Sequence, residues 1–311
     1  MGSILTQGFI LGLIISTIRL SVPLIYASIG ETISQRSGLI NIGLEGLLVI
    51  GAFGAFLGVY FTNNPWIGLL CGALSAVALN MLYAFATITL AGNQIVNGMV
   101  LNILALGIAN LAYNSIFDVT GNPISVNGFK PIGGEFLKVH PILNAFFGHT
   151  VLVYLLIVLV VLSYIFLFHT SLGLKLRAVG ENPKAADTLG INPIKIRYLA
   201  ATIGAAFVGM GGAYLSIAYM DKFLSGMVAG RGFIALAAVI FGKWKPGGVV
   251  LACIFFGFAD ALQLRLQALG SPIPYQFLIA LPYILTMVAL AGLVGKSIPP
   301  ASNGTAYIRS K

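Results

Sequence analysis

The sequence predicts an all-α integral membrane protein, a polytopic bundle of about nine transmembrane helices with a range of eight to ten. Hydrophobic residues make up 58% of the 311-residue chain and charged residues only 8%, whereas soluble domains carry about 25% charged residues. The segment 46–117 contains no Asp, Glu, Lys or Arg. At about 1.5 Å per residue it can cross a bilayer core of about 30 Å roughly three times. No Pro-rich, Ser-rich or charged tract divides the chain, so residues 1–311 are expected to form a single membrane domain.

The first part of the chain is expected to cross the membrane four times. The expected spans are 8–30, 46–61, 65–90 and 94–117. The first span lacks a basic n-region and a small-residue cleavage site, so it is expected to be retained and not removed as a signal peptide. Turn signals at Thr62–Pro65 and Ala91–Gln94 divide the long uncharged segment into its three crossings.

The second part adds five expected spans, which are 149–168, 199–219, 228–242, 248–263 and 275–295. Two of them, 228–242 and 248–263, are short and flank the sequence Lys243–Gly248. We therefore expect short or broken helices that meet at a tight hairpin. Each of these expected span boundaries is given to a precision of several residues.

Lys and Arg residues set the expected orientation, because cytoplasmic loops are enriched in them. The segment 169–198 holds five of these residues, and placing it in the cytoplasm puts eleven cationic residues inside and five outside, with Arg19 in a span. The C-terminal tail, 296–311, is then cytoplasmic and the N-terminus external. The formal net charge of +9 is explained by these loops and does not indicate a nucleic-acid partner.

The sequence shows no catalytic or metal-binding constellation. Cys71 and Cys253 lie in apolar stretches without nearby ligand residues, so both are expected to be small core residues. The three His residues lie in loops or at span ends, and no nucleophile–base pair is visible. We therefore expect that the chain is not an enzyme and that it binds no metal or cofactor.

The segment 169–198 is longer than a simple connection between two helices requires. Glu181-Asn182-Pro183 begins an expected short helix with Pro in its first turn, and Gly190 is suited to end it. Small residues on such a helix at the membrane face favour docking of a partner, although a solvated amphipathic loop is the alternative. The residues expected to contact the partner are Glu181, Asn182, Pro183, Lys184, Ala185, Ala186 and Gly190.

Several motifs resemble the permeases of ABC importers. Lys184-Ala185-Ala186-x-x-x-Gly190 has the spacing of their E-A-A-x-x-x-G loop, with Lys184 in place of the usual Glu. Leu176–Pro183 resembles the branched-chain amino acid, ribose and nucleoside group of these permeases, and Arg36–Gly46 is similar to its nucleoside and simple-sugar branch. The similarity extends over about residues 10–295, and Phe241–Pro246 and Phe256–Gln263 fit the same group.

The resemblance implies a division of labour among several chains. A separate cytoplasmic ATPase would hydrolyse ATP, an extracytoplasmic substrate-binding lipoprotein would deliver substrate, and a second, different permease would complete the path. The resemblance further implies a multi-pass protein of the bacterial cytoplasmic membrane, surrounded by lipid. Nucleosides are the expected substrates, with simple sugars second and branched-chain amino acids third. Lys184 leaves open which side chain makes the polar contact with the ATPase.

Polar residues inside the expected spans are candidates for the translocation path, because amides in a membrane core need partners or water. Asn93, Gln94 and Asn97 fall within an arc of about 100° on one helix. Hydrogen bonding between helices is the alternative role for each. The full set of path candidates is Asn41, Glu45, Asn93, Gln94 and Asn97, and the ionisable residues near spans are Arg19, Glu45 and Asp260.

Two other classes of function fit the sequence less well. A secondary transporter would more often show inverted halves and buried ion-coupling acids, and the segment 46–117 has no acids. A membrane-embedded enzyme would need a catalytic constellation, and the sequence shows none. The ABC permease is therefore the favoured class.

Overall fold

The computed structural model describes residues 7–117, 124–132, 141–269, 276–277, 284 and 297–308. Within these ranges all regular elements are helices, and the only strand-like pairings are isolated bridges at Ser125–Lys222 and Pro131–Thr150. The helices are α1 (Gln7–Arg36), α2 (Leu44–Thr62), α3 (Pro65–Ala84) with a π-helical turn η1 (Phe85–Thr89), α4 (Gln94–Ile116), α6 (Pro141–Phe147), α7 (Val151–His169), α8 (Ser171–Glu181), α9 (Pro183–Thr188), α10 (Pro193–Tyr214) with a π-helical turn η2 (Leu215–Tyr219), α11 (Arg231–Phe241) and α12 (Pro246–Ala268).

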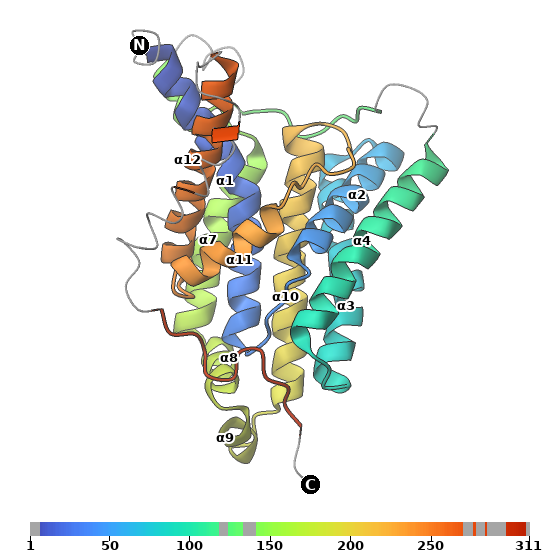
Figure 1. The fold of residues 1–311 in the computed structure, drawn as a ribbon, viewed down its shortest axis with the longest axis vertical. Helices are drawn as coiled ribbons and strands as arrows, with labels where there is room; N and C mark the ends of the chain where they lie inside the picture. The colour runs from blue at the N-terminus through green and yellow to red at the C-terminus, as the bar shows by residue number, and fades with distance from the viewer. Residues whose placement is uncertain are drawn as a thin grey trace.

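Helices α2 and α10 form the centre of the bundle. Helix α10 packs against α1, α2 and α3, and in Figure 1 it lies between α1, α7 and α12 on one side and α2, α3 and α4 on the other. The most apolar windows of α10 and α2 are 78% and 72% buried, against 28% for α4 and α7. The outer helices expose large apolar side chains such as Ile103 (74%) and Leu111 (71%). An apolar exterior around a packed interior is the arrangement expected for a bundle in lipid.

Seven helices of the described chain are long and apolar enough to cross a membrane. The predicted spans 46–61, 65–90, 94–117 and 149–168 agree with α2, α3 with η1, α4 and α7 within a few residues. The first helix continues past residue 30 to Arg36. Helix α10 begins at Pro193, not near residue 199, because Asn192 accepts a hydrogen bond of 3.2 Å from the Lys195 nitrogen and caps it.

The two helices around the predicted hairpin differ from each other in length. Helix α11 has 11 residues and is not among the candidate spans, because it is only about 16 Å long. Helix α12 has 23 residues and is a full candidate span, longer than the predicted 248–263. The tight hairpin itself is confirmed, with Lys243 and Trp244 both at a φ of 54°. The predicted span 275–295 lies mostly outside the described residues, so the count of about nine is not confirmed.

Close contacts between helix backbones depend on glycine. A Cβ atom on Gly30 of α1 would lie 2.4 Å from the carbonyl oxygen of Gly204 in α10, and one on Gly204 would lie 2.8 Å from the Gly30 oxygen. Any larger residue at either position would push the two helices apart. Small residues at helix contacts allow the dense packing that replaces hydrophobic driving force inside a membrane.

The two ends of the bundle carry different elements. At one end, which we call the α9 end, lie α8, α9 and the C-terminal residues (Figure 1). The opposite end holds the first turns of α1 and the end of α4 that leads into the segment 124–132. In Figure 1 the short helix α11 lies oblique to the long helices at middle height, so its first turn is within the bundle.

Candidate functional site

The short helix predicted after Glu181 is present as α9. Asn182 Oδ1 accepts a hydrogen bond of 3.0 Å from the Ala185 nitrogen, so Asn182 caps a helix whose first residue is Pro183. Gly190 has a φ of 80°, and the Ile191 nitrogen donates to the Ala186 oxygen at 3.0 Å. This left-handed ending is the one for which glycine is preferred.

The face that α9 presents to a partner differs from the predicted face in one residue. Ala186 is only 3% exposed and points into the protein, so it is not available to an external contact. Lys184, Ala185 and Thr188 are exposed, and Leu189 is 81% exposed. These exposed residues, on and directly after α9, are available to an external contact.

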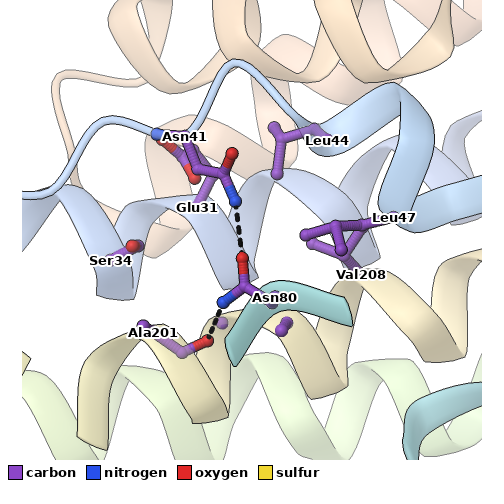
Figure 2. A pocket seen from close by; sticks show the side chains of 10 residues that line it. Glu31, Ser34, Asn41, Leu44, Leu47, Asn80, Ala201 and Val208 are labelled. Atoms are coloured by element: carbon purple, nitrogen blue, oxygen red, sulfur yellow. Dashed lines mark hydrogen bonds between the residues drawn. The ribbon is translucent and has the colours of Figure 1, made fainter. Parts of the chain in front are cut away.

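A second candidate site is a buried polar cluster between α1, α3 and α10 (Figure 2). Asn41 Nδ2 donates to Asn80 Oδ1 at 2.9 Å, and Asn80 Nδ2 donates to the Ala201 oxygen at 2.9 Å. Glu31 Oε1 accepts from Gln35 Nε2 at 2.7 Å and from the Asn41 nitrogen at 2.9 Å. These four side chains are at most 3% exposed. They link α1, the loop before α2, α3 and α10 through hydrogen bonds.

The cluster encloses a cavity of about 10 Å³ lined by Glu31, Ser34, Asn41 and Asn80 together with apolar side chains. A volume of this size holds about one water molecule. It cannot hold a sugar or a base. In this conformation the cluster therefore joins helices, and it does not form an open passage.

Glu31 was missed by the sequence prediction because the first span was expected to end at residue 30. A signal was present. Ser28, Glu31 and Gln35 recur at intervals of three and four, which is the spacing of one helix face. Continuing the helix to Arg36 keeps these polar side chains inside the bundle, where Ser28 donates to the Ala235 oxygen of α11 and Gln35 accepts from Trp244 Nε1.

Glu45 makes its contacts with the backbone of another helix. Its Oε1 atom accepts from the Gly230 nitrogen at 2.8 Å, and its Oε2 atom accepts from the Gly232 nitrogen at 2.7 Å. Gly230 is the N-cap of α11 and offers no side chain for capping. The carboxylate therefore satisfies two N–H groups that the first turn of a helix leaves unpaired, where a negative charge is also favoured by the helix dipole.

The three amides predicted to share one arc have separate roles in the structure. Asn93 is exposed and caps α4 by accepting from the nitrogens of Ile95 and Val96. Gln94 is 2% exposed and accepts from the Ile40 nitrogen at 2.7 Å. Asn97 is partly buried, and its Nδ2 atom has no hydrogen-bond partner in the described chain. Their contact with substrate stays a prediction.

The ionisable residues predicted near spans do not bond to one another in the described structure. Arg19 is exposed on α1, whereas Asp260 is partly buried on α12 and interacts electrostatically with Arg231. Arg231 is the first residue of α11 and donates to the oxygens of Met227 and Val228. In the described ranges no three His, Cys, Asp or Glu side chains gather in a group that could hold a metal ion.

The comparisons with known proteins agree with this architecture. A family model described as the branched-chain amino acid transport system / permease component matches residues 13–294. The fold resembles a solved metal-chelate-type ABC transporter in an inward-facing conformation, with a TM-score of 0.51, 18% identity, and coverage of 94% of this chain and 91% of that chain.

Three curated relatives share more of the sequence. The guanosine ABC transporter permease protein NupQ of Bacillus subtilis is 38% identical, covering 95% of this chain and 96% of its own. The nucleoside permease protein NupC of Lactococcus lactis is 40% identical, covering 94% and 95%. The glucose permease protein TsgC13 of Haloferax volcanii is 39% identical, covering 85% and 80%. With a family model spanning residues 13–294 and these relatives, the chain belongs to the branched-chain amino acid transport system permease family of ABC transporters.

Proposed function

We propose that this permease subunit conducts nucleosides into the cell as part of an ATP-driven importer. The observation that carries the proposal is the identity of 38–40% to a guanosine permease and a nucleoside permease over at least 94% of the chain. The family description names branched-chain amino acids, but these two relatives act on guanosine and nucleosides. Simple sugars are the second candidate, because a glucose permease is 39% identical over a shorter part of the chain.

The chemistry of the spans supports a neutral substrate. The segment 46–117 has no charged residue, and a zwitterionic amino acid crosses a low-dielectric core poorly without compensating groups. Amides such as Asn93 and Asn97 both donate and accept hydrogen bonds, which suits hydroxyl groups and the edges of heterocycles. Asn41, Glu45 and Gln94 are already bonded within the chain, so they would reach the path only if the helices move.

The energy source in this proposal is a separate ATPase. It docks on the exposed face of α9, where Leu189 and Ala185 provide an apolar centre and Lys184 provides a positive charge. Lys184 replaces the acidic residue usual in this motif, so we expect an acidic side chain opposite it on the ATPase. ATP is bound and hydrolysed by that partner, and this chain binds no cofactor of its own.

Two further partners complete the proposed importer. The mate permease is a different chain, because Bacillus subtilis has a second guanosine permease protein, NupP, that is only 27% identical to the present sequence, against 38% for NupQ. An extracytoplasmic substrate-binding lipoprotein selects and delivers the nucleoside. The protein spans the bacterial cytoplasmic membrane with the α9 end and the C-terminus inside, as the distribution of Lys and Arg favours.

Uptake of labelled guanosine, uridine, ribose, glucose and leucine tests the substrate. Cells that contain the gene are compared with cells that lack it and with cells that carry it on a plasmid. We expect guanosine and uridine uptake to fall on deletion and to return with the plasmid, while the other three stay unchanged. A selective loss of ribose, glucose or leucine uptake would contradict the nucleoside assignment.

A further inference from the structure

The C-terminal strap, which we define as residues 297–308, crosses the α9 end of the bundle (Figure 1, red). It begins against α11, where Ser297 Oγ donates to the Ile240 oxygen at 2.9 Å. It then passes α8 and α1, and Asn303 Nδ2 donates to Gln35 Oε1 at 3.2 Å. A terminal segment that only trailed into the cytoplasm would not contact so many helices.

Arg197 of α10 is one anchor of the strap. The residue is 1% exposed. Its Nη1 atom donates to the Thr305 oxygen at 3.1 Å, its Nη2 atom to Ser302 Oγ at 3.5 Å, and its Nε atom to the Ser37 oxygen at 3.2 Å. A buried guanidinium needs acceptors for its N–H groups. Two of these three acceptors belong to the strap.

Gln94 of α4 is a second anchor and bonds the same strap residue, Thr305, as Arg197 does. Its Nε2 atom donates to the Thr305 oxygen at 3.4 Å and to the Gly38 oxygen at 3.3 Å. The Thr305 carbonyl therefore joins α10 and α4. The Gly304 nitrogen adds a bond of 3.3 Å to the Gly38 oxygen, just after α1.

On its other side the strap bonds the helices that face the partner. Ser302 donates to the Gly180 oxygen of α8 twice, from its nitrogen at 2.9 Å and from its Oγ at 2.6 Å. The Tyr307 hydroxyl donates to Asp187 Oδ2 of α9 at 2.9 Å, and the tyrosine is 8% exposed. The Ala301 nitrogen reaches Glu181 Oε2 at 3.3 Å.

We propose that the strap couples the ATPase-docking helix α9 mechanically to α10 and α4, a role that rests on the proposed importer function. Helix α9 has six residues, too few to be stable or stiff alone. Residues 189–192 join α9 directly to α10, and the two helices contact each other. The strap adds a second route from α9 that also reaches α4, with Tyr307 on α9, Ser302 on α8, and Thr305 on Arg197 and Gln94.

The test uses the assembled importer in liposomes, with the ATPase, the mate permease and the binding protein. Two mild variants each remove side-chain hydrogen bonds of the strap. Tyr307→Phe removes the bond to Asp187 of α9, and Ser302→Ala removes the Oγ bonds to Gly180 of α8 and to Arg197. A truncation after Pro300 removes most of the strap. The matched controls are Ala306→Ser, which changes an exposed strap residue, and a truncation after Ile308. ATP hydrolysis is measured with and without guanosine-loaded binding protein, together with guanosine transport.

We expect the strap variants to assemble and to keep basal ATP hydrolysis near the wild-type rate. Stimulation by loaded binding protein should fall by about 5-fold or more, the lower end of usual coupling between sites, and the ATP spent per guanosine transported should rise. The two controls should behave like the wild type. Tyr307→Phe decides the question if the larger truncation fails to assemble.

Two results distinguish a failure of the strap proposal from a failure of the proposed importer function. If protein level and transport fall together in Tyr307→Phe and Ser302→Ala while stimulation and the ATP spent per transported molecule stay normal, the strap only stabilises the fold and the proposal is wrong. If the wild-type complex shows no stimulation by any nucleoside, the proposed substrate is wrong. The strap variants are then compared with the substrate that does stimulate.

Discussion

Glu45 and Gly232 are separated by 187 positions in the sequence, yet the Gly232 nitrogen donates a hydrogen bond of 2.7 Å to Glu45 Oε2. A Cβ atom on Gly232 would lie 2.3 Å from the Glu45 nitrogen, so the first turns of α2 and α11 touch through their backbones. The N-termini of two helices, each with unpaired N–H groups, meet here around one carboxylate. Without that negative charge the two positive helix ends would repel each other.

We expect Glu45→Ala to lower the free energy of unfolding by about 3 kcal/mol, because two hydrogen bonds to a charged group are lost at the start of α11. Glu45→Gln keeps one acceptor and should cost less. Gly232→Ala should also be destabilising, and the effects of Glu45→Ala and Gly232→Ala should not add, because both act on the same contact. The melting temperatures of the purified variants in detergent measure this, and an unchanged value for Glu45→Ala would contradict it.

We expect Asn80→Leu to destabilise the bundle by about 2–4 kcal/mol, because the Asn41 amide and the Ala201 carbonyl each lose a buried partner. Ser75→Ala, one to two turns earlier on α3, is the matched control. Ser75 bonds to the Ile50 and Gly72 oxygens, so its loss should cost about 1 kcal/mol. Chemical or thermal unfolding in detergent compares the two variants. Equal losses of stability in the two variants would mean that the buried cluster of Glu31, Asn41 and Asn80 stabilises the bundle no more than an ordinary hydrogen bond between helices does.

Two substitutions, one on α9 and one directly after it, separate docking from folding. Leu189→Asp changes a side chain that is 81% exposed, so the protein should insert and remain stable while its association with the ATPase and its transport fall by tenfold or more, about 1.4 kcal/mol. Ala186→Glu should lower both stability and transport, because Ala186 is buried within the chain. Co-purification of the ATPase and uptake are the two measurements. Normal ATPase binding by Leu189→Asp would show that this face does not dock.

Cysteine labelling tests the orientation. Ser125 and Ser171 are both exposed. Ser125 belongs to the segment that follows α4, at the end of the bundle opposite to α8, which begins at Ser171. In a chain with Cys71 and Cys253 replaced by alanine, Ser125→Cys should react with a membrane-impermeant maleimide in intact cells. Ser171→Cys should react only after the cells are made permeable. The reverse pattern would place α9 outside and exclude a cytoplasmic ATPase on it.

The sequence by itself determined the features that depend on local interactions. Long apolar runs need no distant partner to be recognised as spans, because lipid replaces water for each of them separately. The α9 helix was predictable for the same reason, since its cap at Asn182 and its ending at Gly190 involve only residues within five positions. Family motifs extended these predictions to the class of transporter, and the family match bears them out.

The tertiary structure alone decided which polar residues meet. Glu45 bonds the backbone 185 and 187 positions away, and Arg197 bonds Thr305 at a separation of 108. It also decided that Ala186 points inward while Leu189 points outward, because α9 is too short for its own pattern to define a buried face. Helix packing selects these contacts from many sequence-compatible ones, and each buried polar group then takes the partner that packing brings within reach.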